Sequence, residues 1–192
     1  MPSTKQFDVD EALDRAMEAF WERGFEATSM TELLGRMGIQ KGSFYATFSS
    51  KHAVYLQAFE HYVSKRFRKF EAEMDGLPPL AAIEKMFELV QGECGSSARK
   101  KGCLVINAAL ELAPSDPDVG RIVRKTLSYH EKLLTSLIQK GKASGEIAAH
   151  IDDKQTSKAL LGLIISMRVY SRAGMPAAYA ASLRTQAMSM LE

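Results

Sequence analysis

Apolar residues recur at helical spacing along almost the whole chain, and the alternating patterns typical of β-strands are nearly absent. Leu13, Ala16 and Phe20, for example, fall on one face of a helix, and Gly24 ends that run. Other runs are separated by breaks that contain glycine or proline, of which the strongest is Gly-Leu-Pro-Pro at residues 76–79. The chain is therefore predicted to be all-α.

The apolar runs and the breaks between them predict about nine helices. Their expected bounds are residues 9–24, 30–38, 41–48, 50–73, 80–93, 102–112, 116–142, 154–173 and 177–191. Asp8 and Ser29 stand where N-terminal caps are preferred, and each precedes a glutamate by three residues, the pattern of a capping box. The break at 76–79 is the best candidate for a boundary between an N-terminal domain and a C-terminal helical bundle.

With 192 residues, of which 46 % are apolar and 25 % charged, the chain can bury a core of ordinary size. Its first residues are polar and acidic, unlike a signal peptide, and its longest strongly apolar run, residues 159–167, is too short to span a bilayer. We therefore expect a cytoplasmic protein with no membrane partner, whose 2 cysteines are free thiols. No residues stand at metal-binding spacing, and no metal or cofactor is expected.

Charge is distributed unevenly over the first part of the chain. Residues 1–35 contain eight acidic and three basic side chains, whereas residues 36–70 contain seven basic side chains and one acidic one. A basic block of this kind favours a polyanionic partner. A solvated helix face explains the same pattern equally well, so charge alone does not decide between them.

The segment at residues 38–48 reads GIQKGSFYATF and lies directly after the second predicted helix. Two helices joined by a tight turn containing Gly38 have the helix-turn-helix layout, in which the second helix enters the major groove of DNA. Phe44 and Phe48 are four residues apart and can anchor this short helix. Its opposite face then presents Lys41, Gly42, Ser43, Ala46 and Thr47 to a groove, where hydroxyl and ammonium groups can bond phosphates or base edges.

Two motifs make a more specific comparison possible: AxxxFxxxGFEATSM at residues 16–30 and MGIQKGSFYATFSSK at residues 37–51. Through them, residues 9–59 resemble the DNA-binding domain of the TetR/AcrR family of bacterial repressors. The resemblance implies phosphate contacts from Ser29, Thr31, Tyr45 and Lys51. It implies recognition contacts from Gln40, Lys41, Gly42, Ser43 and Thr47. Two positions depart from the common pattern, because Gln40 replaces a small hydroxyl residue and His52 replaces an acidic one.

The resemblance implies a helix-turn-helix domain at 1–50, a linking helix at 51–75 and a ligand-binding and dimerisation domain at 76–192. The expected function is that of a transcriptional regulator, a repressor that binds a palindromic operator as a homodimer and is released by a small-molecule or electrophile inducer. The alternative is a helical protein-interaction or RNA-binding module. An enzyme is not expected, because no nucleophile with a base, metal set or phosphate loop is visible.

Candidate residues in the second half rest on apolar character rather than on motifs. Residues 159–170 are apolar on nearly every side, and the last predicted helix is rich in alanine, as expected for half of a four-helix dimer interface. The predicted interface residues are Leu160, Ile164, Ala177, Ala181 and Met188. The predicted pocket residues are Met86, Phe87, Val90, Cys103, Tyr129, Leu133, Met167 and Tyr170. Each of these two sets has an ordinary internal core as its alternative.

Cys103 is a candidate reactive thiol, because it follows Arg99, Lys100 and Lys101 and opens a predicted helix. Nearby cations and a helix N-terminus favour thiolate over thiol, and a thiolate would react with electrophiles. Its alternative role is that of a small apolar residue packed inward. The 4 histidines show neither metal nor triad spacing and are expected to be surface or core residues.

Overall fold

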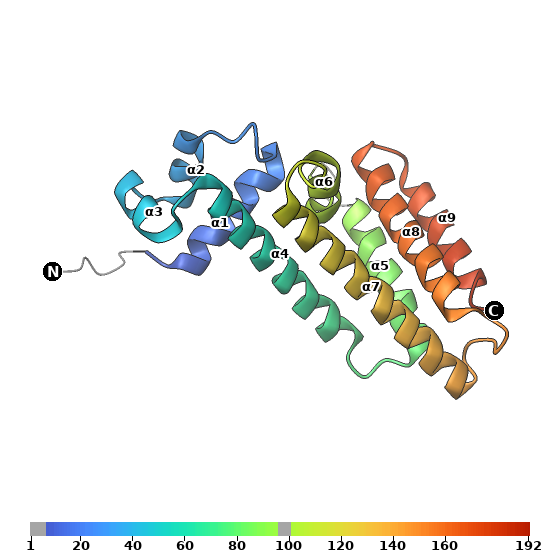
Figure 1. The fold of residues 1–192 in the computed structure, drawn as a ribbon. Helices are drawn as coiled ribbons and strands as arrows, with labels where there is room; N and C mark the ends of the chain where they lie inside the picture. Colours follow the sequence, from blue (N-terminus) through green and yellow to red (C-terminus); the bar gives the residue numbers. More distant parts are fainter. Residues whose placement is uncertain (1–6, 96–100) are drawn as a thin grey trace. The chain divides into compact units, whose positions relative to one another are not determined.

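The structure is a computed structural model that describes residues 7–95 and 101–192 (Figure 1). Within these ranges every regular element is a helix, which confirms the prediction of an all-α chain. The helices are α1 (Val9–Arg23), α2 (Met30–Met37), α3 (Lys41–Phe48), α4 (Lys51–Met74), α5 (Pro79–Gly95), α6 (Leu104–Glu111), α7 (Pro117–Ser144), α8 (Asp153–Arg172) and α9 (Ala177–Ser189).

Most helix bounds agree with the sequence prediction to within two or three residues, and the exceptions have local causes. The start of α6 is later than predicted because Gly102 has a φ of 67°, which no helix accommodates. Asp8 and Ser29 cap α1 and α2 as predicted. The reciprocal half of each capping box is not used, because Glu11 pairs with Arg15 and Glu32 pairs with Arg23.

The described chain forms two compact units, and the division does not follow the order of the sequence. The first unit contains residues 7–67 together with 107–122, and the second contains 68–95, 101–106 and 123–192. The segment 107–122 was expected in the C-terminal domain. It joins the first unit instead, where its apolar side chains Leu112 and Val119 are buried. Part of the second half of the sequence is therefore built into the unit that carries the predicted helix-turn-helix.

Large aromatic side chains form much of the core of the first unit. Phe20, Phe44, Phe48 and Phe59 are each at most 2 % exposed, and Leu33 of α2 is fully buried among the core residues. Burying a side chain of this size contributes about 1.5–3 kcal/mol. Because these residues come from α1, α2, α3 and α4, the first four helices are held as one body around them.

The second unit is a helical bundle in which α5, α8 and α9 pack against one another (Figure 1). Its core includes Ile83, Phe87, Leu134, Ile138 and Leu160, all fully buried. Ion pairs at its edge join Arg184 of α9 to two glutamates of α5 and Arg168 of α8 to a third. Among the described residues, no helix is both long enough and apolar enough to cross a membrane.

Candidate nucleic-acid interface

The turn between α2 and α3 has the backbone that a helix-turn-helix needs. Gly38 adopts the left-handed conformation (φ 71°, ψ 30°) at the end of α2, and its N–H donates to the carbonyl of Leu34 at 3.0 Å. A residue with a Cβ is strained in this conformation, so glycine is required here. Ile39 follows and is buried, which draws the chain back onto the core before α3 begins. The predicted tight turn at Gly38 is confirmed.

Two phenylalanines fix α3 to the first unit. Phe44 is 0 % and Phe48 1 % exposed, and their ring centroids lie 5.6 Å apart. Residues four apart share one face of a helix, so a single side of α3 supplies the whole anchor. This confirms the predicted anchoring role and determines which face of α3 is left open.

The open face of α3 consists of small and polar residues. Its exposed members are Lys41, Gly42, Ser43, Tyr45 and Ala46, and Thr47 is half-buried. A Cβ built on Gly42 would meet no other part of the chain within 4 Å, so packing within the chain does not require glycine there. Gln40 precedes α3, and its side chain makes no capping hydrogen bond. Its amide is therefore not engaged as the cap of this helix.

The residues predicted to contact phosphate flank α3 on the neighbouring helices. Ser29 is exposed and caps α2, its hydroxyl oxygen accepting from the N–H of Glu32 at 3.1 Å, and Thr31 is exposed in the first turn of the same helix. Lys51 is the first residue of α4, and its Nζ lies 4.4 Å from the centroid of the Phe25 ring. Helix N-termini attract phosphate through their free N–H groups and their dipole. The arrangement suits a polyanion, and the contacts themselves stay a prediction.

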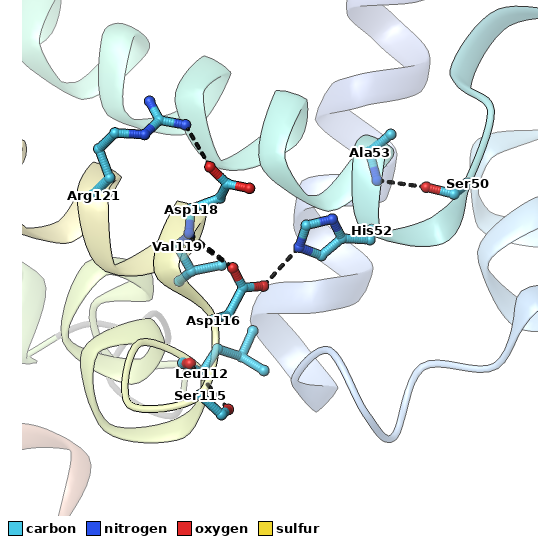
Figure 2. Close-up of polar contacts among 9 residues, drawn as sticks. All are labelled: Ser50, His52, Ala53, Leu112, Ser115, Asp116, Asp118, Val119 and Arg121. Atoms are coloured by element: carbon cyan, nitrogen blue, oxygen red, sulfur yellow. Dashed lines mark hydrogen bonds and ion pairs between the residues drawn. The ribbon is translucent and has the colours of Figure 1, made fainter.

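A pair of residues that the sequence did not single out lies beside Lys51. The Nε2 of His52 is 2.6 Å from Oδ2 of Asp116, and Oδ1 of Asp116 accepts from the N–H of Val119 at 3.1 Å (Figure 2). Burial would raise the pKa of Asp116, but the hydrogen bonds from Val119 and His52 outweigh it and hold this pKa below its ordinary value. The only hint in the sequence was that His52 departs from the common pattern of the family.

The acidic and basic blocks of the sequence partly neutralise each other inside the first unit. Asp14 of α1 accepts from His61 at 3.0 Å and from Lys65 at 2.9 Å, both on α4. Arg36 pairs with Glu22 at 2.7 Å. Some residues of the basic block therefore form ion pairs within the unit and stabilise the packing of its helices. This agrees in part with the alternative in which the block has no polyanionic partner. Of the other basic residues in the block, Lys41 and Lys51 lie on α3 and at the start of α4.

Comparison with known proteins agrees with this geometry. Residues 12–58 match the family of bacterial regulatory proteins described as the tetR family, and residues 76–186 match the tetracyclin repressor-like C-terminal domain. The chain belongs to the TetR family.

Among its TetR-family relatives is the HTH-type transcriptional repressor ComR of Escherichia coli, which is 28 % identical over 172 residues, covering 88 % of this chain and 82 % of ComR. A cysteine mutant of the TetR family regulator CifR, solved in complex with a 26 bp double-strand operator DNA, has a TM-score of 0.86 and 26 % identity over the full length of both chains. The reduced form of Escherichia coli NemR has a TM-score of 0.87 at 17 % identity and covers 97 % of this chain and 98 % of NemR, which shows a shared fold.

In the C-terminal half of this TetR-family chain, most predicted pocket residues lie in or beside the core of the second unit. Met86, Phe87, Val90 and Met167 are at most 1 % exposed, and Leu133 packs partly buried against them. Tyr129 is half-buried and donates its hydroxyl to Glu71 at 2.8 Å. Whether any of them contacts a ligand stays a prediction.

Two further pocket candidates lie elsewhere. Tyr170 is 40 % exposed, and its ring packs edge-on against Tyr179 of α9 at 5.7 Å. Its side chain therefore lies on the surface of α8 and α9 and not in the core, and its place in a ligand pocket stays a prediction. Cys103 is half-buried just before α6. Its expected cationic neighbours Arg99 and Lys100 lie outside the described residues, so its reactivity stays a prediction.

The predicted dimer interface needs a correction on α8. Leu160 is 0 % and Ile164 7 % exposed, and both belong to the core of their own chain, so they are not available to a second chain. Ala177 is exposed, and Ala181 and Met188 are half-buried. The sequence showed that α8 is apolar all round but not which side faces inward.

Proposed function

We propose that this chain is a transcriptional repressor that binds a palindromic DNA operator as a homodimer, with α3 of each copy in the major groove. The observation that carries this proposal is the two-sided character of α3. Phe44 and Phe48 hold one face in the core, while the other face is open, small and polar. A helix fixed in this way can enter a groove about 12 Å wide without rearranging its own unit.

The residues of the open face take different roles according to their chemistry. Lys41 donates to a guanine edge or a phosphate, Ser43 and Thr47 bond base edges or phosphate oxygens, and Gly42 lets the backbone approach the DNA closely. Gln40 adds a side-chain amide that can pair with adenine. Residues at the helix N-termini and Tyr45 fix the orientation on the duplex by phosphate contacts, which carry no sequence information.

Dimerisation uses the exposed surface of α8 and α9. The outer side of α8 presents small and apolar residues, including Ala159, Gly162, Val169 and Tyr170, and Ala177 continues it on α9. A stripe of small residues lets two helices approach closely, and two copies related by a twofold axis place the same surface on both sides. Two linked recognition helices then read half-sites about 34–36 Å apart, or a multiple of that distance.

We infer that the second unit receives the signal that releases the operator. A small molecule or an electrophile is the proposed inducer, with Cys103 as the site for the second kind. The protein acts by binding alone and carries out no catalysis, and it works in the cytoplasm, where bacterial DNA lies. The CifR structure is that of a cysteine mutant, and this supports the electrophile branch by analogy.

The test is a binding titration on duplex DNA selected from a random library by the protein itself. Lys51→Ala should weaken binding to all sequences alike and reduce the slope of log affinity against log salt by about one unit. Lys41→Ala and Thr47→Ala should change base preference instead. Lys140→Ala, which removes an exposed lysine from the second unit, is the matched control and should have no effect.

Selection of no preferred sequence, or equal binding to single-stranded RNA, would contradict the proposal and favour the RNA-binding alternative. An unsymmetrical footprint on one half-site would overturn the dimer. The same titration on maleimide-treated protein, beside treated Cys103→Ser, tests the electrophile branch. If treatment affects both proteins equally, Cys103 is not the sensor and a non-covalent ligand takes its place.

A further inference from the structure

Lys51 is held by an aromatic ring that the loop between α1 and α2 supplies. The loop is closed by Thr28, which is fully buried and donates its hydroxyl to the carbonyl of Gly24 at 2.7 Å. Phe25 in this loop packs against Phe20 at 5.9 Å, and the Lys51 ammonium lies over its ring. The ammonium is at the positive end of the α4 dipole, which disfavours a cation, and the ring offsets this by a cation–π contact.

The same ring also contacts the imidazole of His52. The two ring centroids are 6.2 Å apart at an interplanar angle of 85°, an edge-to-face contact. Because the pKa of Asp116 is lowered, its carboxylate is ionised at neutral pH and can only accept, so Nε2 of His52 donates to it. The donor bond and the ring contact together determine how the imidazole is turned.

Asp116 is itself fixed from several sides. Its N–H donates to the carbonyl of Leu112 at 2.8 Å, and its Oδ1 caps α7 by accepting from the N–H groups of Asp118 and Val119 (Figure 2). The preceding helix also meets the α1–α2 loop, since a Cβ on Gly24 would lie 2.8 Å from a carboxylate oxygen of Glu111. The segment 107–122 thus contacts the α1–α2 loop at Gly24 and the start of α4 at His52.

We propose that His52 is a positioning residue for DNA binding, which holds Phe25 under the Lys51 ammonium and is itself held by Asp116. The order of contacts is Asp116, His52, Phe25, Lys51. An ammonium group has three N–H donors, so it can keep its ring contact and donate to a phosphate from its exposed side. Fixing its long side chain beforehand lowers the entropy lost when the phosphate binds. This inference rests on the proposed phosphate contact of Lys51.

The contact also gives the segment 107–122 a direct route to the DNA-binding surface. Any change that withdraws Asp116 removes the partner of His52, leaves the ring of Phe25 in contact with Phe20 and Tyr55 but not with an oriented His52, and loosens the hold on Lys51. That Lys51 and His52 are neighbours in the sequence is not enough to position the Lys51 side chain, because the peptide bond between them fixes only the backbone. Operator affinity therefore depends on a residue that stands 64 positions after His52 in the sequence.

The experiment is a mutant cycle read by operator affinity and by salt slope, on duplex DNA selected by the unaltered protein. His52→Ala should weaken binding about two- to fivefold, the range expected for a partly exposed pair, and should remove part of the salt slope that Lys51→Ala removes. In the Lys51→Ala background, His52→Ala should cost nothing further. Asp116→Asn keeps the cap of α7 and loses the charge, so it should reproduce the effect of His52→Ala.

Asp118→Asn is the matched control, since Asp118 lies in the same turn and bonds Arg121 instead. Equal losses from His52→Ala with and without Lys51 overturn the inference, as does an unchanged salt slope in both His52→Ala and Asp116→Asn. If Lys51→Ala itself leaves affinity and slope unchanged, the proposed phosphate contact fails first and the inference with it. Circular dichroism and thermal melting identify any variant that does not fold. If either His52→Ala or Asp116→Asn does not fold, the other variant provides the test.

Discussion

Helices α3 and α8 both bury one face and expose the other, and both carry a glycine on the exposed face. Gly42 and Gly162 each have room for a Cβ, with no other part of the chain within 4 Å. The two open faces differ in chemistry. That of α3 includes an ammonium and hydroxyl groups, whereas that of α8 has small or apolar residues between Ala159 and Tyr170 and charged residues towards both ends of the helix.

This difference indicates two kinds of partner. A polar face with a cation loses little by meeting the hydrated, charged groove of DNA, where its donors replace water. An apolar face gains free energy only by removing its surface from water, which a second protein surface accomplishes. We therefore propose that the same arrangement, a glycine opposite a buried anchor, contacts a nucleic acid in the first unit and a second copy of the chain in the second.

The largest expected effect contrasts the two sides of α8. Leu160→Asp should give unfolded or insoluble protein, because the aspartate would be enclosed without a partner. Its cost should exceed the about 2–5 kcal/mol of a buried Leu→Ala change. Val169→Asp alters the exposed side, 43 % open to solvent, and should leave the chain helical while weakening its self-association. Circular dichroism and sedimentation velocity measure the two outcomes.

Lys140→Asp, on the exposed surface of α7 and outside the proposed interface, serves as the control for adding an acidic residue. A folded, soluble Leu160→Asp variant would mean that the core side of α8 is assigned wrongly. Unchanged self-association in Val169→Asp would remove the exposed side of α8 from the interface.

A smaller effect contrasts the two glycines. Alanine is favoured over glycine inside a helix by up to about 1 kcal/mol, so Gly42→Ala and Gly162→Ala should each raise the melting temperature slightly. Gly42→Ala should nevertheless weaken operator binding and leave self-association unchanged. Gly162→Ala should do the reverse, because the added methyl group separates two closely packed helices. Two variants with identical effects on both measurements would show that neither glycine marks a contact surface.

How far the sequence predicts these features depends on whether a periodic pattern separates the two faces. In α3, two phenylalanines four residues apart among small polar residues identify the anchor and the open face, and both were predicted correctly. In α8, apolar residues occur on every side, so periodicity could not distinguish Leu160 from Val169. The predicted interface therefore included Leu160, which lies in the core.

Contacts between single residues that are far apart in the sequence could not be predicted, for a different reason. His52 and Asp116 are 64 positions apart, and neither belongs to a repeated pattern. Asp116 stands at the first position of the helix predicted at 116–142, and no sequence pattern shows which residue its second carboxylate oxygen contacts. The placement of 107–122 in the first unit follows from tertiary packing of residues such as Val119, which local propensity does not encode.

The smallest expected effect compares acid sensitivity in the two units. Burial would raise the pKa of Asp14, but Lys65 and His61 outweigh it and lower this pKa from 3.8. The folded chain then binds fewer protons at Asp14 than the unfolded chain. The resulting stability is present above the unfolded pKa and is lost as pH falls through the folded value. Because the side chain is 37 % exposed, the contribution is less than about 1 kcal/mol.

Asp14→Asn should therefore lower the free energy of unfolding at pH 7 but not near pH 2, as measured by urea denaturation at both values. Asp153, at the start of α8, is the matched residue of the second unit. The hydrogen bond from Gln139 lowers its pKa, and this bond lies at the exposed surface. Solvent screens such a group, so Asp153→Asn should show a weaker dependence on pH than Asp14→Asn. A loss in Asp14→Asn that is equal at both pH values would mean that packing, rather than the charges of Lys65 and His61, accounts for the role of Asp14 between α1 and α4.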